Sequence, residues 1–199
     1  MKVALGLKAH SGWAALVVIG TTREGLQVVD RRRIELIEDG EEWAKMPYHA
    51  AENLEASEAR ALVKRGAESA HRVAARQMRE VVARLHERKD DIVACAVLTP
   101  DPMPSWTTEQ VLAVHFRMHK AEGVLFPDAL CRAAEACDLT LVSVPEKQLD
   151  SIAAKKLAAP MDKVMQTVTL LGKSAGAPWG KDQKTATVAA LIALRARIA

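Results

Sequence analysis

The chain has 199 residues, of which 49% are hydrophobic and 27% are charged, and its formal net charge is +3. This length suits one domain, and the composition is that of a globular protein, which argues against a disordered chain. The three cysteines lack the spacing of a disulfide framework, and polar residues interrupt the apolar start of the chain, unlike a signal peptide. We therefore expect one cytoplasmic domain over residues 1–199, with no membrane-spanning segment.

The first 37 residues predict three strands. Apolar residues alternate along 2–9, and 13–19 (WAALVVI) is a short apolar run. Residues 26–37 mix β-branched and charged side chains, which is typical of a strand at a sheet edge. The short turns between these segments favour an antiparallel meander.

The middle of the chain predicts helices around a buried strand. Residues 39–56 are acidic and irregular and are expected to form a loop or lid, after which helical spacing runs from Ser57 to Leu85. The apolar run 91–98 predicts a buried parallel strand. Thr107 and Gln110 form a capping-box pattern that opens a helix through His119. Gly123 is expected to break that helix before a second helical piece at 128–137.

The last third predicts one more strand and three helices. The strand covers 139–144, and the helices cover 146–157, 161–171 and a final segment that Asp182 caps. The element order is therefore β-β-β-α-β-α-β-α. It predicts an α/β fold with a mixed five-stranded sheet, in which a three-strand antiparallel meander and two parallel strands carry helices on both faces.

This order is that of the ribonuclease-H-like superfamily, and three segments resemble RuvC-type Holliday-junction resolvases. Residues 6–19 (GLKAHSGWAALVVI) resemble the first hairpin of that family, 118–148 resemble its middle, and 182–194 (DQKTATVAALIAL) resemble its closing helix. The resemblance implies a nuclease in which clustered carboxylates hold two Mg²⁺ or Mn²⁺ ions across a scissile phosphate.

The sequence departs from the resolvase pattern at the acidic positions that the resemblance implies. The first-strand acid falls at Lys8, and the fourth-strand acid falls near Leu98 or Thr99, just before Asp101. In the closing helix Asp182 matches an acid, but the second acid falls at Thr185. A single matching carboxylate is too few for two metals, and Lys8 repels cations, so we expect a degenerate nuclease site.

Basic residues offer a binding role instead. From Glu146 to the end of the chain there are nine bases and four acids. A lysine beside the turn 10–12 can bind a phosphate or carboxylate, and bases in the glycine-rich loop 172–180 and the helix start after it can bind an anion. The candidate nucleic-acid or anion-binding residues are Lys8, Arg31, Arg33, Lys173, Lys181 and Lys184. Solvated surface charge is the ordinary alternative for all six.

Two histidines suggest a metal site. His115 and His119 are four residues apart and share a helix face, and Glu122 lies three residues further on. This combination can bind zinc, with His10 as a third ligand if the fold brings its loop there. The alternative is a pair of polar residues on an amphipathic helix.

The sequence therefore leaves three hypotheses. The first is a catalytically degenerate RuvC-like protein that binds DNA, RNA or a protein partner. The second is a Mg²⁺- or Mn²⁺-dependent nuclease that uses Asp101, Glu146 and Asp182. The third is a small-ligand or metal enzyme that uses His10, His115 and His119. A homodimer is compatible with each of them, and none involves a membrane.

Overall fold

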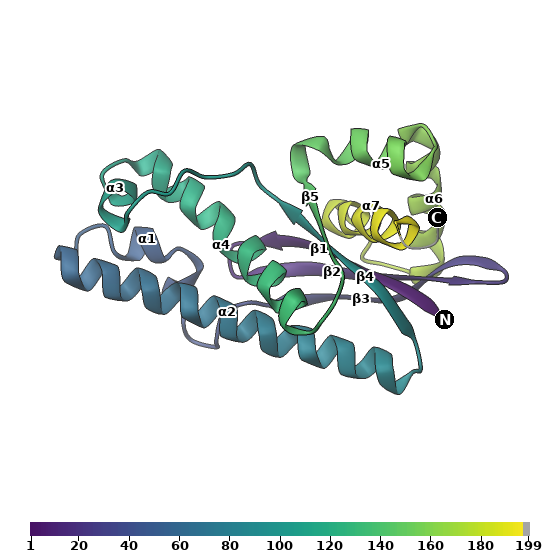
Figure 1. Cartoon of the computed structure of the whole chain (residues 1–199), viewed down its shortest axis with the longest axis horizontal. Helices are drawn as coiled ribbons and strands as arrows, with labels where there is room; N and C mark the ends of the chain where they lie inside the picture. Colours follow the sequence, from purple (N-terminus) through teal and green to yellow (C-terminus); the bar gives the residue numbers. More distant parts are fainter. Residues whose placement is uncertain (197–199) are drawn as a thin grey trace.

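Five strands form one mixed sheet in the computed structural model, which describes residues 1–196 (Figure 1). The strand order is β3-β2-β1-β4-β5. The strands are β1 (Lys2–His10), β2 (Trp13–Thr22), β3 (Gly25–Glu35), β4 (Asp91–Thr99) and β5 (Leu141–Pro145). The first three form the antiparallel meander, and β4 and β5 continue the sheet in parallel with β1. The predicted ribonuclease-H-like fold and the edge position of β3 are confirmed, while 197–199 lie outside the described residues.

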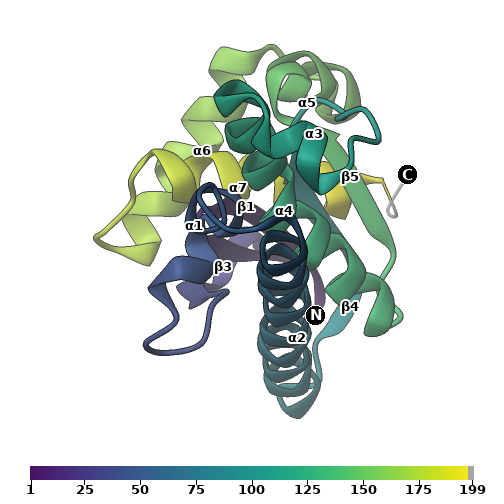
Figure 2. The same ribbon diagram turned by 90° about the vertical axis from the view of Figure 1, so that its left-hand side faces the viewer.

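Helices cover both faces of this sheet. On one face α2 (Ala56–Glu87) and α4 (His115–Ala136) lie side by side, and Figure 2 looks along α2. On the other face lies α7 (Lys181–Arg195), covered in turn by α5 (Leu149–Leu157) and α6 (Met161–Ala175). The remaining helices are short: α1 (Pro47–Ala50), α3 (Thr108–Leu112) and two 3₁₀ segments at Glu42–Lys45 and Glu146–Gln148. No helix in the described part of the chain is long and apolar enough to cross a bilayer.

The alternation of side chains along β1 separates two hydrophobic cores. Val3, Leu5 and Leu7 are fully buried against α2 and α4, whereas Ala4 and Gly6 face α7. Gly6 allows an unusually close approach, because a Cβ there would lie 2.0 Å from the carbonyl oxygen of Ala186. This packing fixes the first turns of α7 beside the carboxyl end of β1.

Several predicted element boundaries were wrong. Gly123 does not break a helix, and α4 runs through both Gly123 and Pro127. A single glycine costs a helix only about 1 kcal/mol, and the buried face of α4 against α2 offsets that cost. The Thr107 capping box is confirmed, but α3 ends at Leu112, before a new helix starts at His115. The expected loop 39–56 contains a 3₁₀ turn and α1, and Gly180 rather than Asp182 is the N-cap of α7.

Candidate functional site

Polar side chains gather where the carboxyl ends of β1 and β5 approach the first turn of α7. Lys8 and His10 come from the end of β1, Glu146 directly follows β5, and Asp182 lies in the first turn of α7. In open α/β sheets, this edge is where binding sites commonly form. We refer to Lys8, His10, Glu146 and Asp182 as the strand-end site.

Lys8 forms an ion pair with Glu146 at this edge. The Lys8 amine donates a hydrogen bond to Oε1 of Glu146. The Lys8 side chain is only 11% exposed, while that of Glu146 is 49% exposed. Lysine is rarely buried without a partner, so Glu146 compensates the charge of Lys8 at the place where the resolvase pattern has an acid.

His10 lies between a tryptophan and a carboxylate. Its ring stacks on Trp13, with ring centroids 4.4 Å apart and an angle of 12° between the planes. Its Nε2 atom is 3.0 Å from Oδ1 of Asp182, although this contact lacks hydrogen-bond geometry. The guanidinium of Arg33 lies 4.2 Å from the centre of the Trp13 ring. The stack therefore holds His10 close to Asp182.

The three carboxylates that the sequence suggested for a relocated nuclease each face a different basic side chain. Asp101 accepts a hydrogen bond of 2.5 Å from Lys147, which lowers the pKa of Asp101 and raises that of Lys147. Glu146 pairs with Lys8, and Asp182 faces His10. Within residues 1–196 these three carboxylates do not form a common group of potential metal ligands.

The residues at this edge do not fit a two-metal centre. Lys8 occupies the position of the first acid, and Leu98, near the fourth-strand position, is 2% exposed in the apolar core against α7. Hard divalent ions need several oxygen ligands, and neither side chain supplies one. The strand-end site therefore holds an internal ion pair rather than a set of oxygen ligands for two Mg²⁺ ions.

The six basic residues predicted to bind anions differ in their surroundings. Arg31 donates hydrogen bonds to the carbonyl oxygens of Ala177 (2.7 Å) and Pro178, and thus ties β3 to the segment before α7. Arg33 pairs with Glu35 at 2.5 Å. Within the described residues, three of the lysines take part in no ion pair: Lys173, Lys181 and Lys184. Among the six predicted residues, these three lysines therefore have the fewest competing partners.

Trp106 and Trp179 both pack against other parts of the protein. Trp179 packs over Gly172, where a Cβ would lie 2.2 Å from its ring, and its Nε1 donates to the Val168 carbonyl at 3.1 Å. Trp106 has the guanidinium of Arg117 over its ring at 4.8 Å. The loop expected at 172–180 is shorter than predicted, because α6 continues to Ala175.

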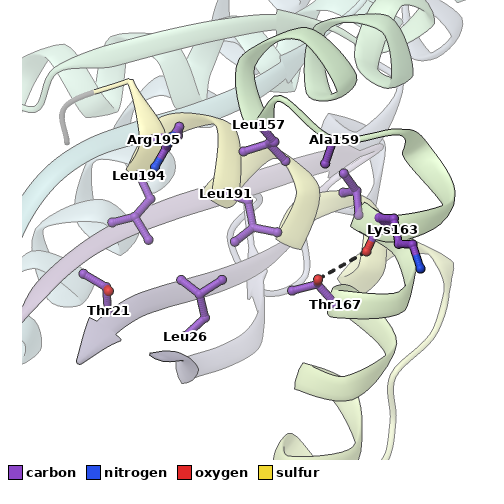
Figure 3. Close-up of a pocket in the computed structure, with 10 residues that line it drawn as sticks. Thr21, Leu26, Leu157, Ala159, Lys163, Thr167, Leu191, Leu194 and Arg195 are labelled. Atoms are coloured by element: carbon purple, nitrogen blue, oxygen red, sulfur yellow. Dashed lines mark hydrogen bonds between the residues drawn. The ribbon is translucent and has the colours of Figure 1, made fainter. Parts of the chain in front are cut away.

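A cavity of about 450 Å³ lies near the other end of α7 (Figure 3). Its lining is mostly apolar and includes Leu26, Leu157 and Leu191, with Lys163 and Arg195 as its cations. No carboxylate or imidazole of the described residues lines it, so it offers no acid–base pair. Asp182 is at the start of α7 and Arg195 is at its end, which separates this cavity from the strand-end site.

Three histidines form a second cluster, between α1 and α4. Potential ligand atoms of His49, His115 and His119 all lie within 4.8 Å of one another. Figure 1 shows α1 next to the start of α4. His10 is not a member, because it contacts Trp13 and Asp182. Glu122 joins the cluster through His49, with Oε2 2.7 Å from Nδ1 of that histidine. Sequence reasoning missed His49, which no local spacing connects to α4.

The comparisons with known proteins identify a shared fold. No family model matches the chain, and no curated protein matches it. Among solved structures, Thermus thermophilus RuvC matches with a TM-score of 0.54 and 14% identity, over 98% of this chain and 96% of that one. RuvC from the same organism in complex with a Holliday junction substrate matches with a TM-score of 0.50 and 15% identity, over 100% and 96% of the two chains. At these identities, the likeness is one of fold.

Proposed function

We propose that this protein is a nucleic-acid-binding member of the RuvC-type fold that binds branched DNA without cutting it. The observation that carries the proposal is the Lys8–Glu146 ion pair at the strand end where the resolvase pattern has a metal-binding acid. The ammonium group repels divalent cations at this point, and because Glu146 compensates its charge, the strand end holds an internal ion pair instead of metal ions. The strand end thus loses its metal-binding role, and we assign phosphate binding to the nearby lysines on α6 and α7.

The lysines around α7 supply the electrostatic part of this proposal. Lys181 and Lys184 lie in the first two turns of α7, and Lys173 lies in the last turn of α6. Phosphate contacts of this kind release counterions, and they make binding steeply dependent on salt. Lys8 is only 11% exposed and is paired with Glu146, so the phosphate contacts are assigned to these three lysines.

Branched DNA is the preferred ligand because the chain matches RuvC over nearly its whole length. One of the matched structures is a complex of RuvC with a Holliday junction substrate. A shape-specific ligand also suits a site built from cations and backbone, which carries no direct readout of sequence. A four-way junction is therefore the first ligand to test, against duplexes and single strands.

Paired charge variants test the proposal. Lys181→Ala with Lys184→Ala removes two cations from α7, and Lys2→Ala with Lys64→Ala removes two from elsewhere on the surface. We expect the α7 variant to bind a labelled four-way junction at least tenfold more weakly. Its slope of log K against log salt should fall by about 1.8, which is about 0.9 for each phosphate that the variant no longer neutralises. The control should change affinity less than twofold. Equal losses of affinity in both variants would contradict the proposed interface.

A further inference from the structure

The histidine cluster joins two segments that are far apart in the sequence. His49 lies in α1, while His115 and His119 occupy the first turns of α4. His115 and His119 are one helical turn apart, so both side chains lie on one face of the helix. Their Nε2 atoms are 3.1 Å apart, and the ring of His49 lies with its centroid 5.1 Å from that of His115 and 4.7 Å from that of His119.

Glu122 fixes the orientation of His49. Its carboxylate is 4% exposed, and Oε2 is 2.7 Å from Nδ1 of His49. The other oxygen accepts hydrogen bonds of 3.1 Å from the backbone N–H groups of both Tyr48 and His49. A carboxylate at Nδ1 selects the tautomer with the proton on that nitrogen, which leaves a lone pair on Nε2.

The Nε2 atom of His49 is buried and has no hydrogen-bond partner among residues 1–196. Buried polar atoms without a partner are rare in native proteins, since they lose the hydrogen bonds that water provides. His115 and His119 direct their own Nε2 atoms toward each other in the same region. The arrangement therefore supplies three imidazole nitrogens, one of which is held ready as an electron-pair donor.

We propose that His49, His115 and His119 bind one Zn²⁺ ion, with Glu122 as a positioning residue that orients His49. Three nitrogen ligands favour zinc over Mg²⁺ or Ca²⁺, which prefer oxygen. In a tetrahedral site with Zn–N bonds of about 2.0–2.1 Å, the nitrogens lie about 3.4 Å apart. The nitrogens here lie within 4.8 Å of one another, so small rotations of the exposed His115 and His119 side chains complete the site.

The proposed site leaves a fourth coordination position for water. His115 and His119 are exposed, and no carboxylate, histidine or cysteine among the described residues joins them as a fourth ligand. Three protein ligands with one open position are typical of zinc ions that bind an exchangeable ligand. The ion would also link α1 to α4, two helices that are far apart in the sequence. This site is independent of the proposed DNA binding, since none of its residues belongs to the strand-end site.

Metal titration of the tag-free protein tests the proposal. We expect one Zn²⁺ per chain with a submicromolar dissociation constant in a chelator competition assay. Co²⁺ in place of Zn²⁺ should give the intense visible bands of a four-coordinate ion. His119→Ala should weaken Zn²⁺ binding at least 100-fold, whereas His86→Ala, an exposed histidine on α2, should leave it unchanged. Circular dichroism shows that each variant is folded.

A second variant separates the role of Glu122 from that of the ligands. Glu122→Gln should keep one Zn²⁺ per chain but lower its affinity about 10- to 100-fold, as is typical when a histidine ligand loses its carboxylate partner. Binding of less than 0.2 equivalents to the native protein, roughly the background of adventitious sites, would overturn the proposal. So would equal affinity in the native protein and folded His119→Ala. No nucleic acid is present, so these results do not depend on the proposed function.

Discussion

Lys8 and Glu146 form an ion pair across the end of the sheet, between strands that are not neighbours. Lys8 lies near the end of β1, Glu146 follows β5, and β4 lies between these two strands. The pair therefore spans the end of β4, where Leu98 is buried in the apolar core. The salt bridge therefore occupies the strand-end position at which clustered carboxylates would lie in a two-metal nuclease.

Removing either partner of this pair should have unequal effects. Glu146→Ala leaves the mostly buried Lys8 ammonium without a partner, so we expect a loss of about 1 kcal/mol in the free energy of unfolding, small because Glu146 is half exposed. Lys8→Met keeps the volume and removes the charge, and should change stability by less than about 0.5 kcal/mol. Urea unfolding of both variants measures the difference. A loss of unfolding free energy in Lys8→Met larger than this would contradict the prediction and would mean that the ion pair is net stabilising.

Gly6 and Gly123 form a matched pair for testing the packing of α7. Gly6→Ala places a methyl group 2.0 Å from the Ala186 carbonyl oxygen, which must displace α7. We therefore expect the free energy of unfolding to fall by about 3 kcal/mol or more. Gly123→Ala places the same group in open space inside a helix and should stabilise the fold by about 0.5–1 kcal/mol. Thermal unfolding measures both. A harmless Gly6→Ala would contradict the close approach of α7 to β1.

The Glu38–Arg76 pair should contribute stability only above acidic pH. Hydrogen bonds of 3.1 and 2.8 Å from Arg76 lower the pKa of Glu38, and Arg72 adds to this effect. Since the folded pKa is below the unfolded value of about 4.3, the contribution is full above that pH and is lost as pH falls through the folded pKa. The difference in Tm between native protein and Glu38→Gln should therefore narrow below about pH 4. A constant difference across pH 3–7 would contradict the pairing.

Cys95 should be the least reactive of the three thiols. Burial raises the pKa of Cys95, with smaller effects from Cys131 and Cys137, which are only partly buried. Because the thiolate is the reactive form, Cys95 should react with a maleimide roughly 100-fold or more slower than Cys137. Peptide mapping after timed labelling checks this. Equal rates would show that the central strand opens easily.

The fold was predictable because its signals are local. Val3, Leu5 and Leu7 are every second residue of one segment, which is the period of a strand. The apolar run around Cys95 predicts a strand that is buried on both faces. The break predicted at Gly123 was wrong because the signal of one residue was weighed without the tertiary packing of α4 against α2. Local propensity is a weak guide where a long buried face continues through it.

The candidate sites were only partly predictable, because they depend on contacts between distant segments. The sequence marked Lys8 as a base in the place of an acid, but not its pairing with Glu146, which is 138 residues away. It marked His115 and His119 by their helical spacing, but chose His10 as the third histidine. His49 lies 73 residues from Glu122, and only the packing of α1 on α4 brings them together.

The most direct test of the central claim is an assay of binding and cleavage with one labelled four-way DNA junction. Native protein is incubated with the junction at two salt concentrations, with Mg²⁺, with Mn²⁺ and without either ion. We predict salt-sensitive binding that prefers the junction over duplex, and intact DNA strands in every condition. Metal-dependent cleavage that Asp182→Asn abolishes would contradict the account and identify an active nuclease, and absence of binding would contradict the DNA-binding role itself.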